Sequence, residues 1–193
     1  MPSPLAHSAA GYVIFRVLRP HLPEAWRLFR RRGALVLGAL CFFSLLPDLD
    51  AVPGVLTHDL LRYHNNLTHS LFLAFPVALA ADGLARWLRL PNPRWWFAAA
   101  FLGYTLHVAM DYFTLGRGIM AFWPLSAARF QPPAYAFVGL RWGDGLSSPN
   151  HWFTLLNEAL FAVLAVLLAH VATRLYRPRE RPAKELAPPP PSE

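Results

Sequence analysis

Long apolar stretches alternate along the chain with short polar connections, and this pattern predicts a membrane helix bundle. A helix that crosses the hydrocarbon of a bilayer needs about 20 apolar residues. The last two stretches meet this length, whereas the first three are shorter and need packing inside a bundle to cross. We therefore expect an all-α, multi-span integral membrane bundle with four to five membrane segments. The apolar stretches are residues 4–18, 34–46, 67–84, 95–115 and 153–176.

Residues that break or start helices mark the ends of these segments. Pro20 breaks the first helix and Pro47 ends the second, because proline cannot continue a helix. Thr68 is placed to cap the third helix, since a threonine hydroxyl accepts a backbone N–H there. Residues 116–150 have no helical periodicity and are rich in glycine, proline and aromatic residues. A loop of that length is usually functional or disordered, and its aromatic content favours an ordered extramembrane loop.

Composition supports one membrane domain followed by a tail. The chain is 55% hydrophobic and 15% charged, well below the roughly 25% charge of soluble domains. We expect residues 1–176 to form a membrane-embedded, hydrolase-like domain. Residues 177–193 are charged and proline-rich, which predicts a disordered tail. The single Cys41 excludes a disulfide framework and a cysteine-based zinc site.

The distribution of basic residues predicts how the chain is oriented. Fourteen of the 18 Lys and Arg residues lie in residues 16–32, 86–94 and 174–184, and the other four lie in 47–66 and 116–150. Basic residues gather in cytoplasmic connections, so we expect 47–66 and 116–150 outside the cytoplasm and residues 4–18 to enter the bilayer with His7 at that outer side. Because the basic residues form no single patch with exposed aromatics, a nucleic-acid partner is not expected.

Ionisable residues cluster where the pattern predicts segment ends. Such groups persist near hydrocarbon when they are paired, bound to a metal or lining a cavity. His107 and Asp111 are four residues apart, so they lie on one helix face and can share a metal ion, or simply form a structural hydrogen bond. Asp48 and Asp50 point the same way only if the chain there is extended. Residues 47–71 also contain His58, Asp59, His64 and His69.

Ordinary structural roles compete for several of these residues. Asp48 or Asp50 can cap the next short helix. His170 lies alone in an apolar segment, and we interpret it as a hydrogen-bonded packing residue. Asp82 is expected to pair with Arg86 four residues later. Glu158 either pairs with His151 or belongs to the polar site.

The order of these motifs resembles the bacterial LexA-regulated, membrane-bound metal-dependent hydrolase family. The resemblance covers roughly residues 5–126. One departure is HNNLTHS, where that family usually has Arg-Gly after the first His. Asn65 and Asn66 can still make a tight turn, but any role of that Arg is absent. The matching residues are His7, then Asp48 and Asp50 in LLPDLD, His64, Thr68, His69 and Ser70 in HNNLTHS, His107 and Asp111 in HVAMD, and Trp123 and Pro124.

The resemblance implies a hydrolase with a divalent metal site, zinc before manganese or magnesium, holding one or two ions. A looser likeness to zinc-dependent phospholipase C favours a phosphoester or lipid-like substrate at the membrane surface, and membrane lipids as partners. We expect a metal-activated water as nucleophile, with Asp50 and Asp48 as the catalytic carboxylates. The expected metal ligands are His7, Asp48, Asp50, His64, His69, His107 and Asp111, and the expected substrate-binding residues are Arg117, Trp123, Arg129 and Arg141.

Two other classes of function remain open at this stage. In a transporter or channel, the buried His and Asp residues would form an ion path. Transporters usually carry inverted repeats, and none is visible in this chain. In a non-catalytic membrane scaffold, the same residues would hold a structural metal.

Overall fold

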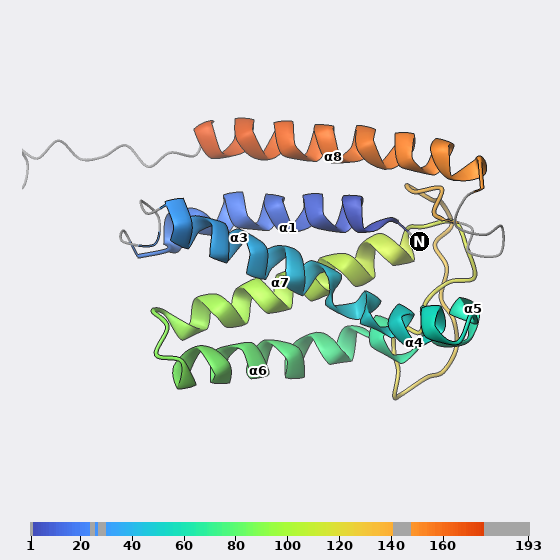
Figure 1. Cartoon of the computed structure of the whole chain (residues 1–193), viewed down its shortest axis with the longest axis horizontal. Coiled ribbons are helices and arrows are strands. Elements are labelled where there is room, and N and C mark those ends of the chain that lie inside the picture. Colours follow the sequence, from blue (N-terminus) through green and yellow to red (C-terminus); the bar gives the residue numbers. More distant parts are fainter. Residues whose placement is uncertain (1, 24–25, 27–29, 141–147, 176–193) are drawn as a thin grey trace, which may run out of the picture.

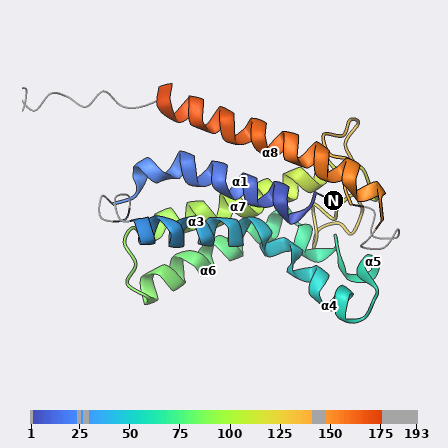
Figure 2. The same cartoon turned by 45° about the horizontal axis from the view of Figure 1, so that its top comes forward.

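The computed structural model describes residues 2–23, 26, 30–140 and 148–175. Five longer helices lie side by side and form a bundle, and short helical turns connect them at one end (Figures 1 and 2). No β-strand forms in the described part of the chain, which confirms the all-α class. The longer helices are α1 (Pro4–Leu18), α3 (Arg30–Leu45), α6 (Ala74–Trp87), α7 (Pro93–Tyr112) and α8 (Asn150–Leu175).

Proline and serine residues set where two of these helices begin. Pro4 and Pro93 occupy the first turns of α1 and α7, where the missing proline N–H has no helical partner to lose. The Ser3 hydroxyl accepts the backbone N–H of Leu5 at 3.3 Å and caps α1. The predicted segments 4–18 and 95–115 are therefore confirmed as helices to within a few residues.

Close helix contacts hold α1 and α7 against α3. A Cβ atom at Gly11 would lie 2.9 Å from the Cα of Cys41, and one at Gly103 would lie 3.1 Å from the Cβ of Phe43. Small residues at such contacts let helix backbones approach closely. Because both glycines face the C-terminal half of α3, the end of α3 is fixed between α1 and α7.

The start of α6 differs from the expected helix. We expected one helix over 67–84 capped by Thr68, but that expectation is wrong. Two short 3-10 turns, η3 (Leu67–His69) and η4 (Leu71–Leu73), precede α6, which starts at Ala74. Thr68 does not cap a helix because its hydroxyl donates a hydrogen bond to the Asp50 carboxylate instead.

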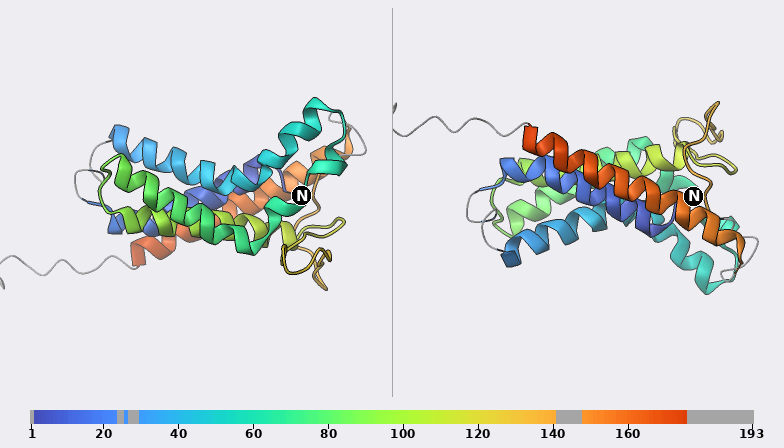
Figure 3. Two further views of the ribbon diagram at one scale, coloured as in Figure 1. Left: turned by 90° about the horizontal axis from the view of Figure 1, so that it is seen from below. Right: turned by 90° about the horizontal axis from the view of Figure 1, so that it is seen from above.

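The connections separate into two ends of the bundle (Figures 1 and 3). At one end lie the N-terminus, the turns η2 (Leu46–Asp50), α4 (Ala51–Leu56) and α5 (Leu60–Tyr63), and the loop that follows α7. At the other end lie η1 (Arg19–His21) and the connection between α6 and α7. The three arginines of 86–94 thus lie at the opposite end from Arg117 and Arg129, as the sequence predicts.

Two helical stretches are long and apolar enough to cross a membrane, namely Arg32–Leu56 and Asn150–Leu175. The other three long helices have 14 to 20 residues. α6, with 14 residues, rises about 21 Å, which is less than the roughly 30 Å of bilayer hydrocarbon. Length and composition therefore support two spans among the described residues, and the expected four to five are not confirmed.

The loop after α7 is ordered over the part that the structure describes, as predicted. Short bridges pair Thr114 with Phe137 and Ile119 with Phe130. The predicted substrate-binding residue Arg141 and the predicted disordered tail 177–193 lie outside the described residues.

Candidate metal centre

The structure brings all seven predicted ligands to one end of the bundle, from four separate parts of the chain. His7 comes from the first turn of α1, and Asp48 and Asp50 come from η2. His64 and His69 lie before and within η3. His107 and Asp111 lie on α7, where both are buried. The predicted grouping is therefore present in three dimensions.

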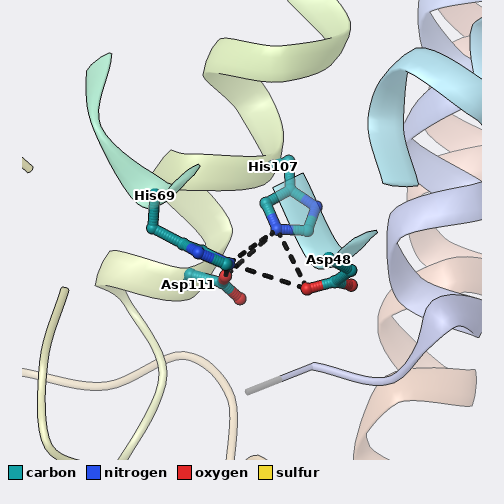
Figure 4. A group of neighbouring side chains, drawn as sticks. All are labelled: Asp48, His69, His107 and Asp111. Carbon is teal, nitrogen blue, oxygen red and sulfur yellow. Dashed lines mark hydrogen bonds and ion pairs between the residues drawn. The ribbon is translucent and has the colours of Figure 1, made fainter. Parts of the chain in front are cut away.

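Four side chains form the centre of the group, which we call the inner quartet: Asp48, His69, His107 and Asp111 (Figure 4). One atom from each lies within 4.8 Å of the corresponding atom of the others. His69 Nε2 is 2.8 Å from Asp111 Oδ2 and 3.6 Å from Asp48 Oδ1. His107 Nε2 is 3.1 Å from Asp111 Oδ2, 3.4 Å from Asp48 Oδ1 and 3.2 Å from His69 Nε2.

These distances fit the donors of a tetrahedral ion. With metal–ligand bonds of about 2.0–2.1 Å, tetrahedral ligand atoms lie about 3.3 Å apart, and the quartet distances fall on both sides of that value. Asp48 Oδ1 and both Asp111 carboxylate oxygens are buried, and the polar neighbours that the described residues give them are imidazole nitrogens of the same cluster. Buried carboxylates need compensating positive charge, and either protonated imidazoles or a shared cation would supply it here.

Protons compete with a metal ion for the same atoms. Burial of the His69 imidazole disfavours its charged form, but hydrogen bonds to Asp111, Asp48 and Asp50 outweigh this, so the pKa of His69 is raised well above its usual value. Without a metal, the raised pKa favours a protonated His69 that pairs with the carboxylates. A metal ion bound at the same atoms would displace that proton.

Groups behind the quartet orient its imidazoles. His107 Nδ1 lies 2.7 Å from the Ser44 carbonyl oxygen, so it donates there and Nε2 carries the lone pair that faces the quartet. His69 Nδ1 lies 3.3 Å from Asp50 Oδ2. Metal-bound histidines commonly have such carbonyl or carboxylate partners on their second nitrogen.

Asp50 contacts this outer layer with both of its oxygens. Its Oδ1 lies 2.6 Å from His64 Nδ1, and its Oδ2 accepts the Thr68 hydroxyl at 2.5 Å. The expected role of Asp50 as a free catalytic base therefore has less support than a role in positioning His64 and His69. Asp48, Asp50 and His64 also form a second group of potential ligands, which keeps a two-ion centre open.

The chain around Asp48 and Asp50 is a 3-10 helix and not the extended segment that we expected. Pro47 lies in the first positions of η2, where its fixed φ favours a helical start. Asp48 and Asp50 therefore face different parts of the cluster, one toward the quartet and the other toward His64. The capping interpretation is wrong for Asp50, whose side chain makes no capping hydrogen bond to α4.

His7 lies directly against the quartet. Its ring stacks on His107 with centroids 3.8 Å apart, and its Nε2 is 3.5 Å from Asp111 Oδ1. Both ring nitrogens of His7 are buried without a hydrogen-bond partner. His7 is therefore a further potential ligand, as the sequence predicts.

Arginines of the loop after α7 fasten the turn that carries His64. Arg117 donates to the His64 carbonyl oxygen. Arg129 donates at 3.0 Å to the carbonyl oxygen of Asn65 and at 2.5 Å to Asn66 Oδ1. Asn65 has a φ of 64°, the left-handed conformation of a tight turn. Substrate binding by Arg117 and Arg129 remains a prediction.

Trp123 is tied to the same motif through its backbone. Its carbonyl oxygen accepts the Ser70 hydroxyl at 2.5 Å, and Leu71 N donates to the Ala121 carbonyl oxygen at 3.0 Å. The Trp123–Pro124 peptide bond is cis. The loop thus packs directly beside the residues that follow His69, and a role of Trp123 in substrate binding remains a prediction.

A second buried carboxylate, Glu158, anchors the N-terminus near the site. Its two oxygens each accept the Ser3 backbone N–H at 2.8 Å, and the Ser3 hydroxyl also donates to it. Sequence reasoning missed Ser3, although a serine before Pro4 is a typical helix cap. The alternative pairing of Glu158 with His151 stays a prediction.

Two structural predictions away from the centre are confirmed. His170 Nδ1 lies 3.2 Å from the Val166 carbonyl oxygen, and its ring stacks on Tyr12, as expected of a packing residue. Asp82 and Arg86 form an ion pair at 2.6 Å.

Comparison with known proteins places most of the chain in one family. Residues 1–179 match the family described as YdjM inner membrane protein. No curated protein and no solved structure matches the chain. The family supports a location in the bacterial inner membrane.

Proposed function

The chain belongs to the YdjM inner membrane protein family, and we propose that it is a membrane-bound metal-dependent hydrolase acting on a phosphoester or lipid-like substrate at the membrane surface. The observation that carries this proposal is the inner quartet of Asp48, His69, His107 and Asp111, whose buried carboxylate oxygens and imidazole nitrogens converge on one point.

The donor set favours zinc. Two imidazoles and two carboxylates suit a tetrahedral Zn²⁺ site, whereas Mg²⁺ prefers six oxygen ligands; manganese is the other candidate. A divalent ion held here supplies Lewis acidity and lowers the pKa of water. The Ser44 carbonyl and Asp50 hold the imidazoles of His107 and His69 in place.

An anionic substrate suits the residues around the site. Arg117 and Arg129, from the loop after α7, donate hydrogen bonds to the turn at His64 and Asn65, and a guanidinium group retains further donors that can bind phosphate oxygens. This is the support for a phosphoester. By the positive-inside rule, the arginine-rich opposite end of the bundle is cytoplasmic, so the proposal places the site on the extracytoplasmic side.

An ion path has less support. The buried polar side chains of the described residues gather at the end of the bundle that holds the quartet. The other half is filled by an apolar cluster that includes Val36, Leu40, Trp95 and Ala99. A path for ions needs polar groups or water across the whole membrane, and the described residues offer none through this cluster.

Metal content and turnover of the detergent-purified protein test the proposal together. We expect stoichiometric zinc or manganese in the wild type, and its loss in His107→Ala and Asp48→Ala. His170→Ala is the matched control, because it removes an imidazole from the same kind of apolar helix outside the centre.

The same preparations are then screened for hydrolysis of soluble phosphomonoesters and phosphodiesters and of phospholipids in vesicles. Turnover that is lost with the metal supports a hydrolase. Bound metal without turnover on any of these substrates would favour the structural scaffold, and a protein without bound metal would refute the proposal.

A further inference from the structure

The turn η2 and the helix α4 carry exposed apolar side chains immediately beside the metal centre. The exposed fractions are 53% for Leu49, 52% for Val52, 56% for Val55 and 77% for Leu56. Several neighbouring apolar side chains left exposed on one short segment usually mark a contact surface. None of these four side chains belongs to the proposed ligand set.

This exposed segment continues the exposed apolar surface of α3. The apolar stretch Arg32–Leu56 is one continuous candidate span of 25 residues, and α3 itself exposes Leu35 and Phe42. From Arg32 to Leu45, α3 rises about 20 Å, and η2 adds about 10 Å. The sum is close to the roughly 30 Å of hydrocarbon, so η2 lies at the membrane boundary.

Beyond this boundary the chain turns. α4 leaves the bundle obliquely, as seen from below the view of Figure 1 (Figure 3). Its apolar side chains are followed by exposed polar residues at the tip, Thr57, His58 and Asp59. A short segment with apolar sides and a polar end is suited to lie in the interface between headgroups and acyl chains.

Asp48, which lies in η2 beside this segment, is the most exposed member of the quartet. The Asp48 side chain is 19% exposed, whereas those of His69, His107 and Asp111 are fully buried. Val52 follows Asp48 by one helical turn and is half exposed. The accessible edge of the quartet is therefore bordered by apolar side chains.

We propose that Leu49, Val52, Val55 and Leu56 pack against lipid acyl chains, and that the substrate is an amphiphile which reaches Asp48 from the bilayer with its anionic headgroup leading. The contact with lipid stands on the exposed surface and its continuity with α3. The amphiphilic substrate rests, in addition, on the proposed hydrolase function.

Fluorescence quenching in vesicles tests the contact with lipid. Single cysteines replace Val55, Phe42 and Ala127 in a Cys41→Ala background and carry the environment-sensitive fluorophore NBD. Phe42 is the control on the exposed face of α3, and Ala127 is the control on the exposed loop. We expect position 55 to resemble position 42, with quenching by spin-labelled lipid and little quenching by iodide.

Two results would overturn the contact. Iodide quenching at position 55 equal to that at position 127 would place α4 in water. Protection of position 55 from both quenchers would mean that protein, such as a second copy of the chain, covers the surface. Neither result depends on metal or turnover, so both are separable from a failure of the proposed function.

Two substrates with the same phosphomonoester bond test the amphiphile. Phosphatidic acid in vesicles carries acyl chains, and glycerol phosphate does not. The double variant Val52→Ser, Val55→Ser should lower turnover of phosphatidic acid about tenfold, because each serine removes apolar contact area, and should leave glycerol phosphate turnover and bound metal unchanged. Equal losses on both substrates, no loss on either, or no wild-type turnover of phosphatidic acid would overturn the amphiphilic substrate.

Discussion

Replacement of Asp111 by Asn is the sharpest test of the metal centre. The Asp111 side chain is fully buried, and its carboxylate faces three imidazoles at 2.8 Å (His69), 3.1 Å (His107) and 3.5 Å (His7). Asparagine keeps the size and shape but removes the negative charge. If the three imidazoles and Asp48 surround a cation, the variant loses one of two anionic ligands in the quartet.

The size of the effect follows from the position of Asp111. Loss of a residue behind a metal ligand typically lowers metal affinity 10- to 100-fold. Asp111 contributes an atom to the quartet itself, so we expect a loss of at least about 100-fold, or about 2.7 kcal/mol. At saturating zinc, the stabilisation that the ion confers on the folded protein falls by the same amount.

Zinc titration and thermal unfolding in detergent measure this effect. Zinc should raise the unfolding midpoint of the wild type clearly more than that of Asp111→Asn, with a chelator reversing both shifts. Asp82→Asn is the matched control, because Asp82 carries the same group but pairs with Arg86 at the other end of the bundle. Wild-type zinc affinity in a folded Asp111→Asn protein would refute the metal centre.

Three further changes probe the surroundings of the centre. Asp50→Asn should lower the metal affinity about 10- to 100-fold, which is a smaller loss than we expect for Asp111→Asn. If metal titration shows an equal or larger loss, Asp50 is itself a ligand. Glu158→Gln removes a charged acceptor at the start of α1, so unfolding free energy should fall by about 1.5–3 kcal/mol with metal content unchanged; lost metal would contradict this. In intact cells, an impermeant maleimide should label the Ala127→Cys variant, whereas the Arg94→Cys variant should be labelled only after the cells are permeabilised. The reverse labelling pattern would place the site in the cytoplasm.

The sequence predicts most of the helices, and it predicts which ionisable residues the fold brings together, for an identifiable reason. Apolar stretches of helical length specify α1 to the residue and α7 to within two or three residues at each end. The cluster is predictable because ionisable groups in apolar segments are few, and His107 and Asp111 lie four residues apart on one helix face. Rare polar residues in an apolar chain restrict where chemistry can occur.

The arrangement of the two aspartates was not predictable from local pattern. Asp48 and Asp50 alternate as in an extended chain, yet Pro47 starts a 3-10 turn. Their division between the quartet and His64 depends on contacts with residues 14 to 59 positions away in the sequence. Tertiary contacts of this kind override local preference, and for the same reason the Ser3–Glu158 contact, across 155 residues, escaped prediction.

The positions of the ligands along their helices reconcile an apolar chain with an ionisable centre. His7 lies in the first turns of α1, Asp48 lies in η2 three residues after the end of α3, and Asp111 lies one residue before the end of α7. Because each comes from the same end of the bundle, a bilayer around the helices would leave their charges near its boundary, where an ionised group costs less than at the bilayer centre. The apolar cluster around Leu40 and Trp95 then fills the remaining depth. Placing the ionisable side chains at one end lowers the cost of burying them in an apolar bundle, and it restricts any reaction that they support to that end.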